Sequence, residues 1–185
     1  MPGPAIRIDH LAYVDALAER TPGAIDLVVI HCTELPDLAM ARAYGERVLY
    51  ADSNTGNSGH YYVDRDGSIV EYVDPLRIAH HTRGYNARSV GIELVNTGRY
   101  PDWLDSRRQA MDEPYTDVQI EALIALLNEL RTRIPPLTQI AGHEDIDTDE
   151  VAATDEPSIL VRRKRDPGPK FPWQRILDVV PLRRL

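Results

Sequence analysis

Apolar and β-branched residues recur along this chain in short runs separated by turn residues, a pattern that predicts several strands. The run Leu27-Val28-Val29-Ile30 ends in His31 and predicts a buried strand in the middle of a sheet. A hairpin is expected over 60–73, because aromatic and β-branched residues flank Asp66-Gly67 and the glycine supplies the positive φ of a tight turn. Further strands are predicted at 6–8, 89–95 and 137–141.

Helical spacing of apolar residues predicts two amphipathic helices and a short C-terminal one. Asp37 is expected to cap a helix over 38–49. The stretch Thr116-Asp117-Val118-Gln119 matches a capping box, in which the threonine caps the helix and the glutamine reaches back. The core-facing stripe that follows comprises Ile120, Leu123, Ile124, Leu127, Leu130 and Ile134, and Pro135 ends it. A last helix is expected within 171–177, with a proline near its first turn.

The order of these elements predicts an α/β fold, with a central mixed β-sheet flanked by helices in a single domain. A length of 185 residues suffices for one core without disulfide bonds. We expect residues 1–24 to form an N-terminal extension packed on a domain of residues 25–185. The acidic stretch between Ile146 and Leu160 has no periodicity and is expected to be a loop. Two basic residues after it, Arg162 and Arg163, are expected to be solvated.

Composition narrows the classes of partner. The formal net charge of −8 argues against nucleic acid and against an anionic membrane surface. No apolar run approaches the roughly 18 residues that a membrane-spanning helix needs, and the first residues lack the apolar core of a signal peptide. The single cysteine, Cys32, cannot form an internal disulfide, which suits a reducing compartment. These features predict a cytoplasmic monomer.

Three residues that follow apolar runs or precede a rigid turn offer a set of metal ligands. His31 closes the central strand, His143 follows the strand at 137–141, and Asp166 stands before Pro167-Gly168-Pro169. Two imidazoles and one carboxylate are a common ligand set for a catalytic zinc, with the fourth position left for water. Cys32 is expected to point to the opposite face of the strand from His31, because side chains alternate along a strand. It is therefore expected in the core or behind the ligands.

Two charged residues near this set have alternative explanations. Glu93 lies in the otherwise apolar strand 89–95, where a carboxylate is costly unless it is paired or has a catalytic task. It is either half of a structural ion pair with an arginine or a general base. Lys164 lies two residues before Asp166, and in an extended segment the two side chains point the same way. Its ammonium could stabilise a developing oxyanion beside the metal.

Five motifs follow one another along the chain. They are Val28-Val29-Ile30-His31, Tyr61-Tyr62-Val63 before Asp66-Gly67, Ser89 through Leu94, Gly142-His143-Glu144-Asp145-Ile146, and Lys164 through Phe171 with Trp173. In these motifs and their order, over roughly residues 25 to 177, the chain resembles the type 2 zinc N-acetylmuramoyl-L-alanine amidases, a family related to phage lysozyme-type amidases and peptidoglycan recognition proteins. The Lys-x-Asp-Pro-Gly-Pro motif is most similar to the subgroup that includes the cytoplasmic enzyme recycling 1,6-anhydro-muropeptides.

The resemblance implies a role for each matching residue. Zinc would be bound by His31, His143 and Asp166; Glu93 and Lys164 would be catalytic; and His81, Asn86 and Arg88 would contact the substrate. There are two departures from the family pattern. The loop between His143 and Lys164 is longer than in the compact recycling enzymes, and Gly59 stands where phage-type members have a tyrosine near the metal, which leaves the base role to Glu93.

The implied reaction is zinc-dependent hydrolysis of the amide between the lactyl group of N-acetylmuramic acid and L-alanine of the stem peptide. Soluble anhydro-muropeptides are the expected substrates, and intact peptidoglycan is an alternative. A second alternative is a peptidoglycan-binding module without catalysis, whose relatives have typically lost a metal ligand. A third is a zinc hydrolase acting on a different amide, because substrate contacts come from loops.

Overall fold

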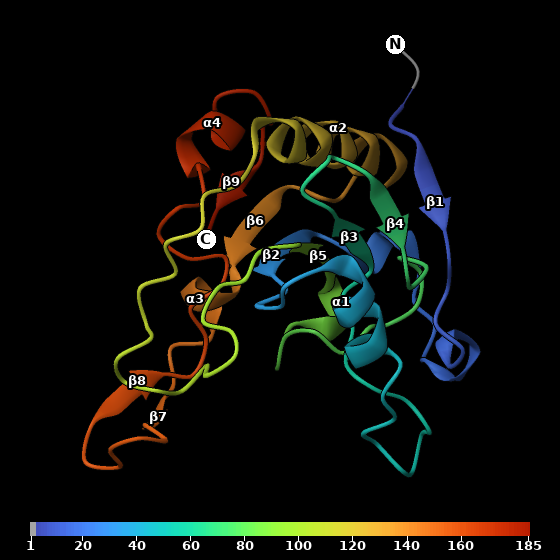
Figure 1. The fold of residues 1–185 in the computed structure, drawn as a ribbon. Coiled ribbons are helices and arrows are strands. Elements are labelled where there is room, and N and C mark those ends of the chain that lie inside the picture. Colours follow the sequence, from blue (N-terminus) through green and yellow to red (C-terminus); the bar gives the residue numbers. More distant parts are fainter. Residues whose placement is uncertain (1–2) are drawn as a thin grey trace.

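The computed structural model describes residues 3–185, and the predicted strands meet in one mixed sheet. Its strands are β1 (Ile6–Ile8), β2 (Leu27–Cys32), β3 (Tyr61–Val63), β4 (Ile69–Glu71), β5 (Ser89–Leu94), β6 (Gln139–Gly142) and β9 (Arg183–Arg184). The order across the sheet is β1-β4-β3-β5-β2-β6-β9 (Figure 1). The predicted α/β fold with a central mixed sheet is confirmed.

The central strand β2 runs parallel to both of its neighbours. It pairs with β5 on one side, where His31 is opposite Glu93, and with β6 on the other, where Ile30 is opposite Gly142. Only the hairpin β3–β4 is antiparallel within this sheet, and Gly67 in its turn has the expected positive φ of 84°. Because parallel strands end at the same edge, the residues that close β2, β5 and β6 are brought together there.

The helices are α1 (Leu38–Gly45), α2 (Asp117–Arg133), α3 (His143–Ile146) and α4 (Trp173–Leu177). Both predicted N-caps form: Asp37 accepts a hydrogen bond from Met40 N at 2.7 Å, and Thr116 accepts one from Gln119 N at 3.2 Å. The reciprocal half of the capping box was predicted wrongly. The buried Gln119 carboxamide donates instead to the carbonyls of Val63 and Val95, each at 3.0 Å, and so ties α2 to the ends of β3 and β5.

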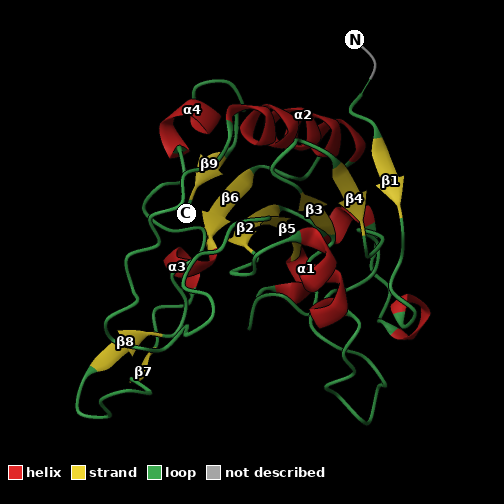
Figure 2. Ribbon diagram, in the orientation of Figure 1, coloured by secondary structure: helices red, strands yellow, loops and turns green. Residues whose placement is uncertain are grey.

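The two faces of the sheet are covered differently. Helices α2 and α4 cover one face, and α1, α3 and long loop segments lie on the other (Figures 1 and 2). Along β5 the large side chains of Val90, Ile92 and Leu94 pack in the core under α2. The residues between them belong to the opposite face, and they are Ser89, Gly91 and Glu93. Ser89 and Gly91 are small, which leaves room on this face of β5 for the polar groups described below.

Three local predictions differ from the structure. The acidic segment predicted as a loop contains a second, two-stranded sheet, β7 (Glu150–Ala152) paired with β8 (Leu160–Arg162). This hairpin projects from the body of the molecule (Figure 1), and Leu160 is 59% exposed. Each of its strands is only 3 residues long, which is shorter than the run of about 4–8 residues over which alternation can be recognised in a sequence. Helix α1 ends at Gly45 rather than at 49, and β9 was not predicted.

The N-terminal segment is integrated with the rest of the chain. The strand predicted at 6–8 forms as β1, which lies at one edge of the sheet and pairs in parallel with β4. The residues that follow pack into a core cluster on the loop-covered face, and they include Leu11, Tyr13, Val14 and Leu17. Within residues 3–185 no helix is both long enough and apolar enough to cross a bilayer.

Candidate metal and active site

A buried cluster of two imidazoles and one carboxylate lies at the edge where β2 and β6 end. His31 is in β2, His143 begins α3 directly after β6, and Asp166 lies in the segment before Pro167. Asp166 Oδ2 lies 2.9 Å from His31 Nδ1 and 3.1 Å from His143 Nδ1. One candidate ligand atom from each residue lies within 4.8 Å of the others. Their exposed fractions are 2%, 3% and 3% in that order, so the cluster is shielded from bulk water.

The chemistry of this cluster fits a bound cation. Asp166 Oδ1 is buried without a hydrogen-bond partner, and such an orphaned oxygen needs a cation or proton donor. Burial opposes ionisation of Asp166, but the neighbouring His143 and His31 outweigh it and hold the pKa of the carboxyl well below its usual range. Burial lowers the pKa of His31 to about 4, so its ring is neutral at pH 7 and has a lone pair to offer.

Hydrogen bonds and an ion pair hold together the segments that carry the candidate ligands His143 and Asp166. The α3 residue Glu144 donates its backbone N–H to the Asp166 carbonyl at 2.9 Å. Asp145 caps α3 by accepting a hydrogen bond from Gly142 N at 2.8 Å, and Arg184 of β9 pairs with the same carboxylate. The end of β6, the first turn of α3 and the Asp166 segment are therefore one connected unit.

Glu93 faces the cluster from the neighbouring strand. Its Oε1 lies 3.9 Å from His31 Nδ1, and its side chain is 15% exposed. Burial, followed by the negative charge of Asp166, raises the pKa of Glu93 to about 8, and the nearby Lys164 charge opposes this rise. A Cβ on Gly59 would lie 2.8 Å from Glu93 Cγ, so a glycine at this position makes room for the glutamate. No arginine pairs with Glu93 among residues 3–185, which disfavours the structural ion pair.

The segment that carries Lys164 is held in place by a buried ion pair. Arg99 pairs with Glu34, at 2.7 Å from Nε to Oε1 and 2.9 Å from Nη2 to Oε2. The same guanidinium donates to the carbonyls of Arg162 and Arg163, at 2.9 and 3.3 Å. Glu34 has a positive φ of 49°, which is unusual for a residue with a side chain. The Arg99–Glu34 pair therefore links the segment that follows β2 to the residues directly before Lys164.

The three residues predicted to contact substrate occupy different surroundings. His81 lies at the cluster, with Nδ1 at 3.0 Å from His31 Nε2. Asn86 lines the same cleft, but its side-chain oxygen accepts hydrogen bonds from the backbone of His81 and Thr82, at 3.0 and 2.7 Å. Arg88 lies outside the cleft, directly before β5, where it pairs with Asp26. Its role toward substrate stays a prediction without a supporting contact.

A cleft of about 890 Å³ opens over the cluster and contains Glu93 and Lys164 in its lining. Its rim combines aromatic and basic side chains, namely Tyr44, Tyr50, Trp103, Arg47, Arg83 and Arg163. The cleft can therefore take a ligand with an extended polar and anionic part, whose reactive bond would lie at the buried cluster.

Cys32 lies beside the ligand strand end but outside the cluster. It is 4% exposed and free, and the group of residues that could hold a metal does not include it. Burial, together with Glu34, raises the pKa of its thiol well above the ordinary value, which disfavours the thiolate that zinc requires. The prediction that strand alternation turns Cys32 away from the cluster agrees with this placement.

Sequence reasoning missed several residues that support the site. Arg163, expected to be solvated, contacts the buried Asp147 carboxylate, and Arg83 approaches the same carboxylate at 3.6 Å. Arg162 donates to the Glu144 carbonyl at 2.7 Å. A run of basic residues next to an acidic segment indicated that ion pairs could form here, but it does not specify which charges pair. These contacts connect the His81 loop, α3 and the Lys164 segment.

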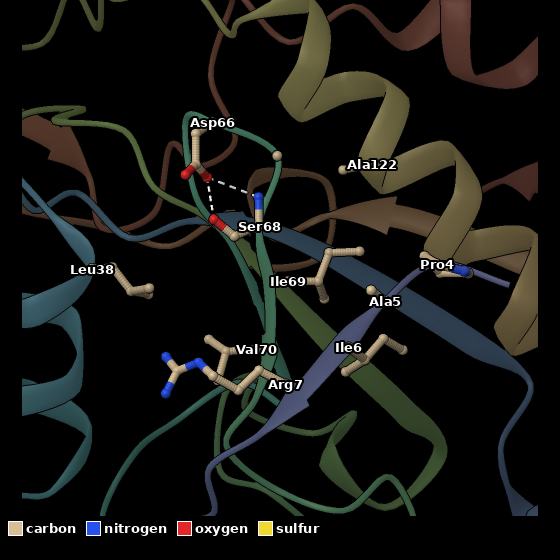
Figure 3. A pocket seen from close by; sticks show the side chains of 11 residues that line it. Pro4, Ala5, Ile6, Arg7, Leu38, Asp66, Ser68, Ile69, Val70 and Ala122 are labelled. Carbon is tan, nitrogen blue, oxygen red and sulfur yellow. Dashed lines mark hydrogen bonds between the residues drawn. The ribbon is translucent and has the colours of Figure 1, made fainter.

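A second hollow lies on another part of the molecule, between β1, the β3–β4 turn and α2 (Figure 3). Its lining includes Arg7 and Asp66 but neither histidine nor cysteine. The Asp66 carboxylate is already used by the backbone N–H and hydroxyl of Ser68. This hollow therefore offers no set of ligands or nucleophiles comparable to the cluster at His31.

Comparisons with known proteins agree on one family. The family model for N-acetylmuramoyl-L-alanine amidase (Amidase_2) matches residues 21–169. A 1,6-anhydro-N-acetylmuramyl-L-alanine amidase AmpD from Citrobacter freundii is 33% identical over 132 residues, which are 66% of this chain and 57% of that protein. For the first three curated relatives the aligned part covers 51–58% of their length.

Solved structures show the same fold. An AmpD crystal structure superposes with a TM-score of 0.67 at 26% identity, covering 95% of this chain and 94% of that one. The amidase AmiD from E. coli, in complex with the substrate anhydro-N-acetylmuramic acid-L-Ala-D-gamma-Glu-L-Lys, superposes with a TM-score of 0.64 at 26% identity. That match covers 87% of this chain and 59% of the AmiD chain.

Proposed function

Because this chain belongs to the N-acetylmuramoyl-L-alanine amidase family, we propose that it is a zinc-dependent amidase acting on muropeptides. The bond hydrolysed is the amide between the lactyl group of N-acetylmuramic acid and L-alanine of the stem peptide. One observation carries the proposal: His31, His143 and Asp166 converge in a buried cluster, with Glu93 and Lys164 in the lining of the cleft above it.

The proposed metal is zinc, held by one nitrogen from each imidazole and by Asp166. Neutral imidazoles and an ionised carboxylate are ligands that zinc prefers, and three protein ligands leave a position for water or substrate. When bound, zinc would supply a Lewis acid that polarises the scissile carbonyl and acidifies the attacking water. The orphaned Asp166 Oδ1 and the neutral His31 ring support this assignment.

Glu93 is the proposed general base and acid. Its carboxylate accepts a proton from the attacking water and delivers it to the leaving amine of L-alanine, which departs as a neutral group. The position opposite His31 on the adjacent strand supports this role, because it brings the carboxylate beside the ligand cluster. A raised pKa suits a group that must both take up and release a proton near neutral pH.

Lys164 is the proposed electrostatic stabiliser of the reaction. As the water adds to the carbonyl carbon, negative charge develops on the carbonyl oxygen, and a fixed ammonium nearby lowers the energy of that state. The support for this role is the anchoring of the preceding carbonyls by Arg99 and the electrostatic influence of Lys164 on both Glu93 and His31.

Soluble anhydro-muropeptides are the proposed substrates. Curated relatives are named 1,6-anhydro-N-acetylmuramyl-L-alanine amidases, and the AmiD structure contains an anhydro-muramyl peptide. A net charge of −8 gives little attraction to an anionic polymer such as the cell wall. We also propose that the protein is a cytoplasmic monomer that acts in cell-wall recycling. Under this proposal it binds neither nucleic acid nor membranes.

Two alternative functions have less support. A peptidoglycan-binding module without catalysis would not need Glu93 and Lys164 beside a complete ligand set. A zinc hydrolase acting on another amide would share the cluster and differ only in the rim of the cleft.

To test the proposal, purified protein loaded with zinc is incubated with soluble anhydro-muropeptides, and the products are identified by mass. Release of the intact stem peptide supports the proposal, and binding without release would favour the module.

A further inference from the structure

The side of His31 that faces away from the ligand cluster has a specific partner. His31 Nδ1 faces Asp166 and the proposed metal position, whereas Nε2 lies 3.0 Å from Nδ1 of His81. The two rings meet edge to face, with centroids 5.1 Å apart and an angle of 84° between their planes. Two imidazole nitrogens at this distance form a hydrogen bond only if one carries a proton and the other does not.

The surrounding contacts determine which nitrogen carries each proton. As a metal ligand, His31 Nδ1 has no proton, so the neutral ring is protonated at Nε2 and donates to His81 Nδ1. His81 must then be protonated at Nε2, which lies 3.2 Å from Ser89 Oγ. The Ser89 hydroxyl in turn donates to the Tyr85 carbonyl at 2.8 Å. Every donor in this series of hydrogen bonds has one acceptor, and the series ends on the backbone carbonyl of Tyr85.

We infer that His81 is a positioning residue, which fixes the tautomer and orientation of the ligand His31 through this hydrogen bond. The inference rests on the proposed function, because it assumes that His31 binds the metal. Partners of this kind behind a ligand are general in metal sites, and they orient the ring and tune its basicity. The substrate contact predicted for His81 is replaced in this assignment, since both ring nitrogens are used within the protein.

The backbone around His81 is built to hold its ring in this place. A Cβ on Gly91 would lie 2.6 Å from His81 Cγ and Nδ1, so the ring rests directly on β5 where only a glycine leaves space. The Asn86 side chain accepts hydrogen bonds from the backbone N–H groups of His81 and Thr82. Ser89, the far end of the chain of hydrogen bonds, is fully buried. The loop and the strand thus present the ring at one angle to His31.

The second imidazole of the cluster lacks an equivalent partner. His143 Nε2 is buried without a hydrogen bond, and its nearest carboxylate oxygen, on Asp147, is 3.9 Å away. His81, by contrast, is a neutral imidazole that accepts a hydrogen bond from His31 Nε2 and adds no negative charge to the site. The two ligand rings are therefore held by different means, and loss of the His81 ring should affect the His31 side of the site.

Zinc affinity tests this inference independently of catalysis. The affinity of the protein is measured by competition with a chromophoric chelator for wild type, His81→Ala, His81→Asn and His80→Ala. We expect His81→Ala to bind zinc about 10–100-fold more weakly, the usual loss for such a partner. His81→Asn should recover most of the affinity, because its carboxamide oxygen takes the position of His81 Nδ1 and can accept the same hydrogen bond. His80, whose ring packs on Tyr50, is the matched control and should leave affinity unchanged.

Two outcomes would overturn the inference while the proposed function stands. One is a wild type that binds zinc with His81→Ala binding equally well. The other is His81→Asn binding as weakly as His81→Ala, because the loss would then come from packing. A wild type that binds no zinc would overturn both proposals.

Ring protonation gives a test that needs no variant. In zinc-loaded protein labelled with ¹⁵N-histidine, NMR correlations between ring nitrogens and carbon-bound protons identify the tautomer of each imidazole. We expect the proton of His31 and that of His81 to be on Nε2, with His81 Nδ1 unprotonated. A proton on His81 Nδ1 would overturn the inference, because that nitrogen could not then accept from His31.

Discussion

Glu93 and His31 are directly opposed in the register of the parallel strands β5 and β2, and Glu93 Oε1 lies 3.9 Å from His31 Nδ1. Neighbouring parallel strands place opposed side chains on the same face of the sheet, so this pairing brings a carboxylate to the ligand cluster without any help from a loop. The proposed general base and the proposed metal ligand therefore lie on adjacent strands of one rigid sheet.

This pairing predicts that Glu93→Gln separates chemistry from metal binding. The amide keeps the shape of the side chain but cannot accept the water proton, so activity should fall by about 100-fold or more. Zinc content should stay at one per chain. Hydrolysis of a soluble muropeptide and metal analysis of the same sample check both parts, and near-normal turnover would show that another group is the base.

Lys164→Met is expected to lower turnover by about 100-fold or more while zinc remains bound. The variant lacks the positive charge that is proposed to stabilise the developing oxyanion. Lys164→Arg is the matched variant, which keeps the charge with a different geometry and should recover part of the activity. Turnover and Michaelis constants are measured for both variants. A methionine variant as active as wild type would exclude the electrostatic role.

Cys32→Ser should leave the zinc content unchanged, because the cysteine lies outside the ligand cluster. His31→Ala is the comparison, and it should lose most of the bound zinc. Metal analysis after dialysis against a weak chelator distinguishes the two variants. A loss of zinc in Cys32→Ser comparable to that in His31→Ala would mean that the ligand set contains sulfur.

Arg99→Met tests the anchor of the Lys164 segment. The variant leaves the Glu34 carboxylate buried without its partner, and breaking such a pair destabilises a protein by about 3–5 kcal/mol. We expect that loss in the free energy of unfolding by urea, together with a lower turnover number. Arg99→Lys keeps the charge but not the bidentate contact with Glu34, so its stability and turnover number should be intermediate. Unchanged stability in Arg99→Met would remove Arg99 as the anchor.

Parallel digestion of purified sacculi and soluble anhydro-muropeptides tests the substrate class. We expect faster release of stem peptides from the soluble fragments, because the acidic chain is not attracted to an anionic polymer. The projecting β7–β8 hairpin (Figure 1) is the feature most able to reverse this preference, since it lies in the chain between His143 and Lys164. Faster release from sacculi would exclude the recycling role and leave the zinc amidase chemistry intact.

The sequence by itself determined the family, the α/β class and the residues of the candidate cluster. His31 and His143 each follow an apolar run, and parallel strands must deliver their ends to one edge, so local patterns were enough to expect that they meet. Glu93 was recognised because a carboxylate inside an apolar strand requires an explanation. The family predicted from five ordered motifs is confirmed by the match over residues 21–169.

Only the tertiary structure decided the partners of these residues. The contact between His31 Nε2 and His81 Nδ1 spans 50 positions, and the pairing of Arg99 with Glu34 spans 65. Gln119 follows a capping pattern, yet its side chain serves two strand ends that no local rule connects to it. A local pattern reports which side chains need burial or a partner. Which partner each one finds depends on contacts between residues far apart in the sequence, and folding alone sets those contacts.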